Sequence, residues 1–161
     1  MELSWSLGPP LHWCLEQLGI RSDQMERAIA IFEREHSRLM PTLRPIVGAD
    51  VVIRELAGMG VPIGVATIKP QPLAENVLEV LGLRDAISCV HGHTDDFDPR
   101  TKTDLLRLAH EELGSGDAIY TGDHDNDEAA AHALNIPFFR YPDHSWETIR
   151  AAVLGATADV P

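Results

Sequence analysis

Three polar features of the sequence could do chemistry together. Thr67 ends an apolar run that starts at residue 61, and Lys69 comes just after it. Lys102 stands at the start of a helical pattern, and the acidic segment 122–127, Gly-Asp-His-Asp-Asn-Asp, follows another apolar run. Carboxylates that converge suit a hard divalent cation, and a hydroxyl beside an ammonium group suits a phosphate. These residue types therefore predict a magnesium–phosphate site.

Each of these features also has an ordinary structural interpretation. Thr67 could simply end a strand, Lys102 could be a solvated helix residue, and the acids of 123–127 could favour the positive end of a helix dipole. Their joint order is more specific than any one of them, because ligands of an open parallel sheet bind at the carboxyl ends of its strands.

The elements that must position these residues follow from the spacing of the apolar side chains. Residues 9–40 predict two helices, the first stopped by Gly19 and the second capped by Ser22 and ended by Pro41. From residue 48 onward, helices alternate with short apolar runs typical of buried parallel strands. We expect strands at 61–67, 87–90, 118–121 and 137–141. Three of the expected helices end at Gly60, Gly82 and Gly114, and two more span 125–134 and 146–154. Thr101 and Asp104 form a capping box at the start of the helix that ends at Gly114.

This alternation predicts an α/β fold with a Rossmann-like, doubly wound parallel sheet. The chain of 161 residues is long enough for one domain with a sizeable core. A helical pair precedes the α/β part, which covers about residues 45–155.

Composition narrows the possible partners and the compartment. With 13 Lys and Arg against 25 Asp and Glu, the net charge is −12. This negative charge disfavours binding to nucleic acids and to anionic membranes. No apolar run is long enough to span a membrane, and the start of the chain has no signal-peptide pattern. The two cysteines, Cys14 and Cys89, form no disulfide framework, so we expect reduced thiols and a cytoplasmic protein.

The motifs in their order resemble the haloacid dehalogenase superfamily, and within it the phosphoglycolate-phosphatase-like hydrolases with a helical cap. The resemblance rests on three core motifs and one cap segment, namely Val65-Ala66-Thr67, Lys102, Gly122-Asp123 through Asp127, and Gly8-Pro9-Pro10-Leu11. It implies a partial helical cap over residues 1–42 and a core over residues 43–161. It also implies a phosphoric monoester hydrolase that acts on a small phosphorylated metabolite.

The resemblance also implies a role for each candidate residue. Thr67 would hydrogen-bond the phosphoryl group and Lys102 would steady its negative charge, so both count as catalytic. Lys69 joins them in binding the substrate. Asp123 and Asp127 would hold Mg²⁺, which we expect to bind only weakly to two carboxylates.

The family's first motif, an apolar strand that ends in Asp-x-Asp, is not found where the family has it. Asp96-Phe97-Asp98 has the spacing but comes after the Thr67 motif, so we expect a solvated loop there. The resemblance therefore implies a truncated chain that begins partway through the cap, without the nucleophilic aspartate. Two strand pairs would then face each other across about 10 Å, twice the usual interstrand spacing. Segment 2–7 is a poor substitute for the missing strand because it carries polar residues.

The remaining polar clusters have simpler interpretations. His91, His93, Asp95 and Asp96 match no closed zinc site, so we expect a polar loop. His124 and Asp125 lie inside the fourth motif at unmatched positions, where they would only shape the rim. Cys14 and Cys89 are expected in the core.

Three functional hypotheses remain at this point. The first is a phosphatase of the haloacid dehalogenase type, inactive or incomplete as this chain. The second is a non-catalytic relative that binds phosphate or a partner protein. The third, a receiver-like or nucleotide-binding module, is weaker because no Gly-rich phosphate loop follows a strand.

Overall fold

A computed structural model describes residues 11–94 and 98–157 of the chain. Helices alternate with four short strands from α3 onward, after a helical pair and its short 3₁₀ turns. The elements in chain order are α1 (Leu11–Gln17), η2 (Ser22–Gln24), α2 (Met25–Leu39), η3 (Met40–Thr42), α3 (Ala49–Gly58), β1 (Gly64–Pro70), α4 (Gln71–Val80), η4 (Arg84–Ala86), β2 (Cys89–His93), α5 (Lys102–Glu112), β3 (Tyr120–Gly122), α6 (Asp125–Ala133), β4 (Phe138–Arg140) and α7 (Trp146–Thr157).

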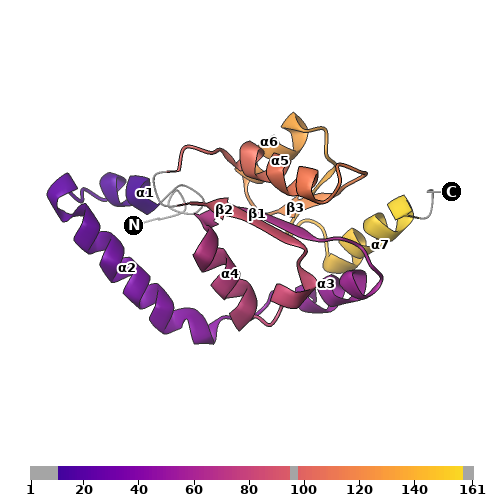
Figure 1. Ribbon diagram of the computed structural model, residues 1–161, viewed down its shortest axis with the longest axis horizontal. Coiled ribbons are helices and arrows are strands. Elements are labelled where there is room, and N and C mark those ends of the chain that lie inside the picture. The colour runs from indigo at the N-terminus through magenta and orange to yellow at the C-terminus, as the bar shows by residue number, and fades with distance from the viewer. Residues whose placement is uncertain (1–10, 95–97, 158–161) are drawn as a thin grey trace.

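The helices enclose the strands in layers (Figure 1). Helix α5 packs on one face of β1 and β2, and α4 packs on the other. Helix α6 lies against α5, while α3 and α7 pack together at the far end from α1 and α2. The predicted α/β class, with parallel strands and a separate helical pair, is confirmed.

The strands form two pairs and not one continuous sheet. Strand β1 pairs in parallel with β2, and β3 pairs in parallel with β4. In the part of the chain that the structure describes, no strand joins the two pairs. Side chains connect them instead, since the Tyr120 hydroxyl of β3 lies 3.5 Å from the Ala66 carbonyl oxygen of β1.

Most predicted helix ends agree with the structure. Gly60 and Gly114 follow their helices with φ of 82° and 101°, a conformation that glycine adopts without strain. The capping box of Thr101 and Asp104 is present at the start of α5. The predicted cap at Ser22 is wrong, because the 3₁₀ turn η2 begins there and α2 starts only after Gln24, which makes no side-chain capping bond.

Both strands of the first pair end later than the sequence predicts. Strand β1 runs on through Thr67 to Pro70, and β2 covers 89–93, so the polar loop expected at His91 and His93 is wrong. The pairing register shifts after Ala66, since four residues of β1 face two residues of β2. Such a bulge bends a strand and redirects its side chains.

The bulge brings two backbone segments very close together. A Cβ atom on Gly92 of β2 would lie 2.6 Å from the Lys69 carbonyl oxygen and 2.7 Å from the Gln71 Cα atom. Only glycine leaves room for this approach. Gly92 therefore allows the irregular part of β1, which carries Thr67 and Lys69, to lie against β2.

Two apolar clusters hold the layers together. One lies between the strands and helices α5 and α6, with Leu105 fully buried at its centre. The other lies between β1–β2 and α4, around Ala74 and Val90. Burial of such side chains stabilises each by roughly 1.5–3 kcal/mol. Among the residues that the structure describes, none of the helices combines the length and apolar character that a bilayer crossing requires.

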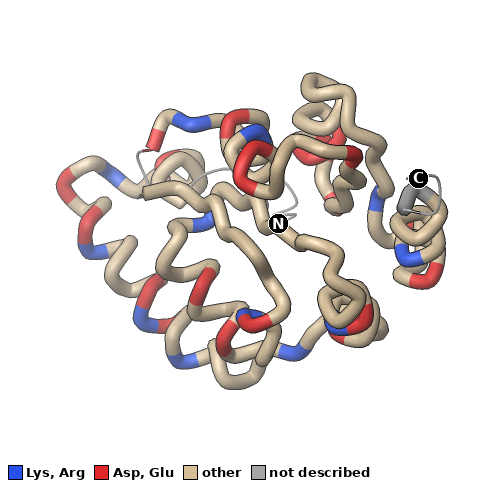
Figure 2. Tube along the Cα trace, turned by 45° about the vertical axis from the view of Figure 1, so that its right-hand side comes forward, with Lys and Arg blue, Asp and Glu red and all other residues tan. Residues whose placement is uncertain are grey.

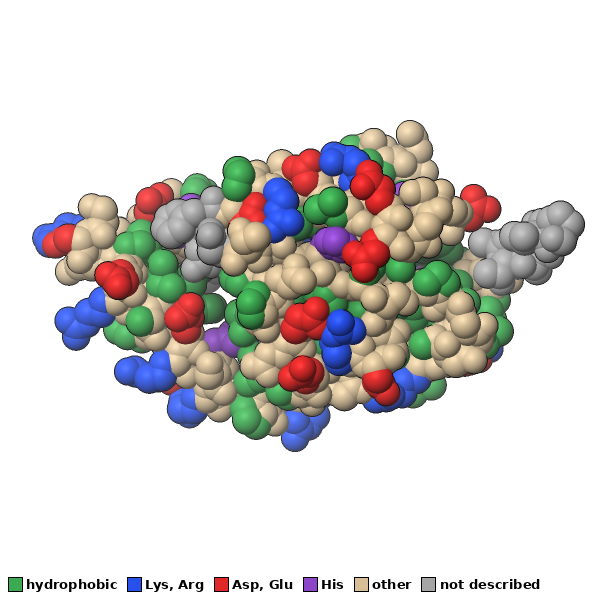
Figure 3. Space-filling view, in the orientation of Figure 1, with side chains coloured by type: hydrophobic (Ala, Val, Ile, Leu, Met, Phe, Trp, Pro, Cys, Tyr) green, Lys and Arg blue, Asp and Glu red, His purple; other side chains and the backbone are tan. Residues whose placement is uncertain are grey.

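Charges of both signs are spread over the molecule. Figure 2 shows acidic residues on many segments with basic residues among them, and Figure 3 shows the same mixture with apolar side chains between. Segment 2–7, Gly8 to Pro10 and residues 95–97 lie outside the described residues.

Candidate active site

The carboxyl-terminal part of β1 presents the first candidate residues. The Thr67 hydroxyl oxygen accepts a hydrogen bond of 3.2 Å from the Lys69 backbone N–H, which fixes the bulged chain locally. The Lys69 side chain is half-buried, and this burial lowers its pKa. A partly desolvated ammonium group favours an anionic partner.

Lys102, the first residue of α5, reaches across to Ala66, where the regular pairing of β1 with β2 ends. Its Nζ donates to the Ala66 carbonyl oxygen at 3.0 Å and forms an ion pair of 2.9 Å with Asp127 Oδ1. The two side chains are 19% and 7% exposed. The capping box places Lys102, because it fixes the point at which α5 begins.

Asp127 is the buried centre of this arrangement. Oδ1 also accepts from the Tyr120 hydroxyl at 3.2 Å, and Oδ2 accepts from the His124 backbone N–H at 3.1 Å. Burial raises the pKa of Asp127, but Lys102 and these hydrogen bonds together hold the pKa below its ordinary value. The carboxylate therefore stays charged at neutral pH, and both of its oxygens have protein partners.

Asp123 lies just after β3, and its residue is exposed. Its carboxylate is close enough to Tyr120 to help raise the pKa of that phenol, after burial and Asp127. It is thus near the Lys102–Asp127 pair but remains open to solvent. An exposed carboxylate at this edge can bind a hard cation.

Gly122 explains the spacing of the acidic motif. A Cβ atom at this position would lie 2.5 Å from the Asp127 carboxyl carbon, so a larger residue would displace that side chain. Asp127 also forms a capping box with His124 at the start of α6. The glycine and the cap together hold the Asp127 carboxylate against the end of β3.

Two residues of this region were missed by the sequence analysis. The Tyr120 hydroxyl donates a hydrogen bond to Asp127. Arg140, at the end of β4, donates to the Asp123 carbonyl oxygen at 3.2 Å. Its guanidinium also forms ion pairs with Asp125 at 2.9 Å and Glu128 at 2.5 Å. Arg140 thus holds the acidic loop in place, and the Asp125 carboxylate contributes one of its ion pairs. The signal was available, since Arg140 lies near the carboxyl end of the fourth expected strand, 137–141, where ligands of a parallel sheet bind.

The structure brings Lys102 and Asp127 into contact at the carbonyl next to Thr67, with Asp123 nearby. Lys69 lies on the side of the helical pair, where it adds to the effect of burial in lowering the pKa of His36 in α2. His36 and Pro70 line a cavity of about 490 Å³ between α2 and α4. None of the five candidate residues, Lys69 included, lines this cavity.

Asp98 differs from the expected solvated loop. Its carboxylate is nearly covered and accepts from the backbone N–H groups of Thr94 and Arg100 at 2.7 and 2.9 Å, and it also pairs with the Arg100 guanidinium. These partners lower the pKa of Asp98. It therefore connects Thr94 with Arg100 and is not free for chemistry.

Comparisons with known proteins identify the family of the chain. The sequence profile of the family described as haloacid dehalogenase-like hydrolase matches residues 1–141. The chain is 30% identical over 124 residues to a phosphoglycolate phosphatase of Escherichia coli, covering 76% of this chain and 47% of that protein. It is 28% identical over 134 residues to the tyrosine-protein kinase PtkA of Mycobacterium tuberculosis, covering 80% and 46%. The chain therefore spans about half the length of the curated relatives it matches.

A solved structure shows the similarity in three dimensions as well. A predicted phosphatase from Clostridium acetobutylicum superposes with a TM-score of 0.71 at 27% identity, covering 93% of this chain and 72% of that one. The similarity includes the helical pair as well as the strands, because it extends over nearly the whole chain.

Proposed function

The chain belongs to the haloacid dehalogenase-like hydrolase family, and on that premise we propose that it provides the phosphate-binding part of a phosphatase active site for small phosphate esters. The observation that carries the proposal is the contact of Lys102 with both the Ala66 carbonyl oxygen and Asp127. It joins the middle of β1, the start of α5 and the first turn of α6 at one point.

The donors around this point support a phosphoryl ligand. An ammonium group has three N–H donors, and Lys102 uses two of them, for Ala66 and Asp127. The third is available to a phosphoryl oxygen. The Thr67 hydroxyl accepts from Lys69, so its own O–H can point to the same ligand, and Lys69 supplies a second positive charge.

The proposed metal is Mg²⁺, which would neutralise charge on the phosphate ester. Asp123 fits this role because its residue is exposed, whereas the carboxylate oxygens of Asp127 already have protein partners. Mg²⁺ sites in proteins use one or two carboxylates, water and substrate phosphate. The residues therefore fit the ion, with few protein ligands and weak affinity.

Titration calorimetry with Mg²⁺ tests this assignment. We expect binding weaker than micromolar, lost in Asp123→Ala and retained in Asp117→Ala, which removes another acid outside the acidic motif. Micromolar affinity, or full binding in Asp123→Ala, would contradict it.

The phosphatase reaction needs a carboxylate nucleophile as well. In the family, an aspartate attacks phosphorus while the ester O–P bond breaks, an acid protonates the leaving alcohol, and water then hydrolyses the acyl phosphate. In the described part of the chain, the carboxylate that contacts Lys102 is Asp127, and its ion pair makes it a poor nucleophile. We therefore propose that this 161-residue chain alone has no appreciable turnover.

Release of phosphate from p-nitrophenyl phosphate and phosphoglycolate in the presence of Mg²⁺ tests the proposal. We expect negligible turnover by the chain alone and a gain of orders of magnitude when an apolar strand ending in Asp-x-Asp is fused to it or added as a peptide. Lys102→Met should abolish the gain, and Arg107→Met should keep it.

Two outcomes would change the conclusion. Robust turnover by the chain alone that is lost in Asp123→Asn would reveal another nucleophile. Binding of inorganic phosphate without turnover in the extended chain would favour the non-catalytic, phosphate-binding alternative. We further propose a cytoplasmic protein whose partner is a small phosphorylated metabolite and neither a nucleic acid nor a membrane, as the net charge of −12 supports.

A further inference from the structure

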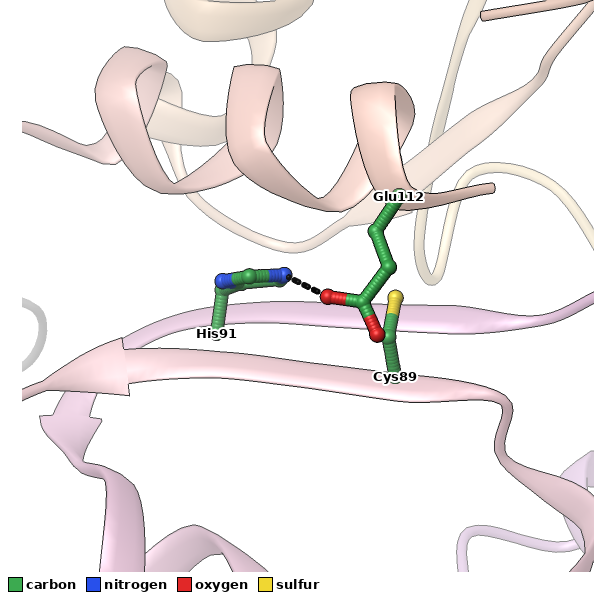
Figure 4. Close-up of side chains that lie close together, drawn as sticks. All are labelled: Cys89, His91 and Glu112. Carbon is green, nitrogen blue, oxygen red and sulfur yellow. Dashed lines mark hydrogen bonds and ion pairs between the residues drawn. The ribbon is translucent and has the colours of Figure 1, made fainter. Parts of the chain in front are cut away.

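A second group of side chains with metal-binding atoms shares no residue with the candidate active site. It is formed by Cys89 and His91 of β2 and Glu112, the last residue of α5 (Figure 4). The sulfur, an imidazole nitrogen and a carboxylate oxygen all lie within 4.8 Å of one another. The side chains point toward one another from the strand and the helix above it.

The fold explains why these three side chains meet. Residues two apart on a strand share a face, so Cys89 and His91 both face α5, which packs on β2. Gly64 of β1 leaves space for the sulfur, since a Cβ atom there would lie 2.9 Å from Cys89 Sγ. Glu112 is ten residues along α5 from Lys102, which corresponds to about 15 Å between their backbones, whereas His91 pairs with Ala66 of β1.

We propose that Cys89, His91 and Glu112 bind one borderline-soft divalent cation of the Zn²⁺ type, with a fourth position left for water. Thiolate, imidazole and carboxylate are the ligands that Zn²⁺ prefers, whereas Mg²⁺ requires oxygen ligands. The site is therefore chemically different from the acidic motif at the other end of α5.

The distances fit such an ion after small movements. Zn–ligand bonds of about 2.0–2.3 Å in a tetrahedron place neighbouring ligand atoms about 3.3–3.6 Å apart. His91 Nε2 now lies 2.8 Å from Glu112 Oε2 in a hydrogen bond, and the wider separations stay within 4.8 Å. Shifts of about 1 Å in flexible side chains would create the tetrahedron.

The surroundings also allow entry and exchange of the ion. The side chains of His91 and Glu112 are 19% and 57% exposed, so the site opens to solvent on one side. Burial, followed by the charge of Glu112, raises the pKa of Cys89. Binding would replace the Cys89 S–H bond with an S–metal bond and release one proton to solvent.

Co²⁺ is a suitable probe, because a bound thiolate gives a near-ultraviolet charge-transfer band and a tetrahedral site gives strong visible bands. The full chain is titrated with Co²⁺ in millimolar Mg²⁺, which occupies oxygen-only sites, and Zn²⁺ is then added to displace it. We expect one Co²⁺ per chain with a thiolate band that Zn²⁺ abolishes.

Variants separate this site from other thiols, histidines and acids. Cys89→Ala should remove the thiolate band and weaken binding by more than about 100-fold, beyond the 10–100-fold cost of outer-shell changes. Glu112→Gln, on an exposed side chain, should weaken binding by about 10-fold without affecting folding. Cys14→Ala, His110→Ala and Asp123→Asn should leave the band unchanged.

Three results would overturn the proposal. They are the absence of a thiolate band at millimolar Co²⁺, a band that persists in Cys89→Ala, and equal affinity in the wild-type chain and Glu112→Gln. Circular dichroism of each variant shows whether the fold is intact, and Glu112→Gln keeps the test decisive if Cys89→Ala is unstable.

Discussion

At the scale of single residues, the Lys102–Asp127 ion pair links structure to the candidate chemistry. Both side chains are largely buried, and breaking a buried pair leaves an uncompensated charge. We expect Lys102→Met to lower the free energy of unfolding by about 3 kcal/mol at pH 7. The measurement is urea denaturation.

The matched control for this change is Arg107→Met on the same helix. Arg107 pairs with Asp104 at 3.0 Å, but both side chains are more than a third exposed, and such surface pairs contribute about 0–1 kcal/mol. An equal loss in the two variants would contradict the importance of burial.

The same pair predicts a dependence on pH. The pKa of Asp127 is lower in the folded chain than its ordinary value, so its stabilisation is present above the unfolded pKa of about 3.9 and is lost as pH falls through the folded pKa. In Lys102→Met the buried carboxylate can relieve its cost by protonation. The difference in unfolding free energy between wild type and variant should therefore shrink between pH 7 and pH 4, and a constant difference would contradict this.

At the scale of elements, the bulge in β1 depends on Gly92 of β2. Gly92→Ala would put a Cβ atom 2.6–2.9 Å from the Lys69 and Gln71 backbones, and overpacking of this kind costs about 1–3 kcal/mol. We expect that loss in urea denaturation, with weaker binding of inorganic phosphate because Thr67 and Lys69 move. Gly116→Ala, which meets nothing within 4 Å, should stay within about 0.5 kcal/mol of wild type. An unchanged Gly92→Ala variant would show that the bulge adapts freely.

The elements also show how far the sequence could predict this molecule. Helix ends were predictable because Gly60 and Gly114 adopt positive φ. The start of α5 was predictable because its capping box involves residues that are close in the sequence. The end of β1 was not predictable, because the register shift after Ala66 depends on the facing strand. Among the candidate site residues, Lys102 was identified by its place at the start of a helix and Asp127 by the acidic segment after a strand, with their roles implied by the family resemblance. Their mutual ion pair and the role of Arg140 require contacts between distant segments.

At the scale of the whole molecule, two strand pairs are held together through helices and side chains. Helix α5 packs on β1–β2 and against α6, and Lys102 and Tyr120 both reach the Ala66 carbonyl oxygen. At the far end, Arg150 of α7 forms an ion pair with Glu55 of α3. The arrangement depends on contacts between residues far apart in the sequence, which is why α5 is the central connecting element.

The place of Lys102 at the start of α5 has a consequence for proteolysis. Lys69 and Lys102 are the two lysines of the chain, and Pro70 follows Lys69, so a lysine-specific protease cuts efficiently only after Lys102. That cut separates residues 1–102, with β1 and β2, from residues 103–161, with β3 and β4. Because the Lys102 side chain is 19% exposed and paired with Asp127, cleavage must wait until the first turn of α5 opens. A single scission event thus reports the opening of the phosphate-binding end, and a ligand that engages Lys102 slows it.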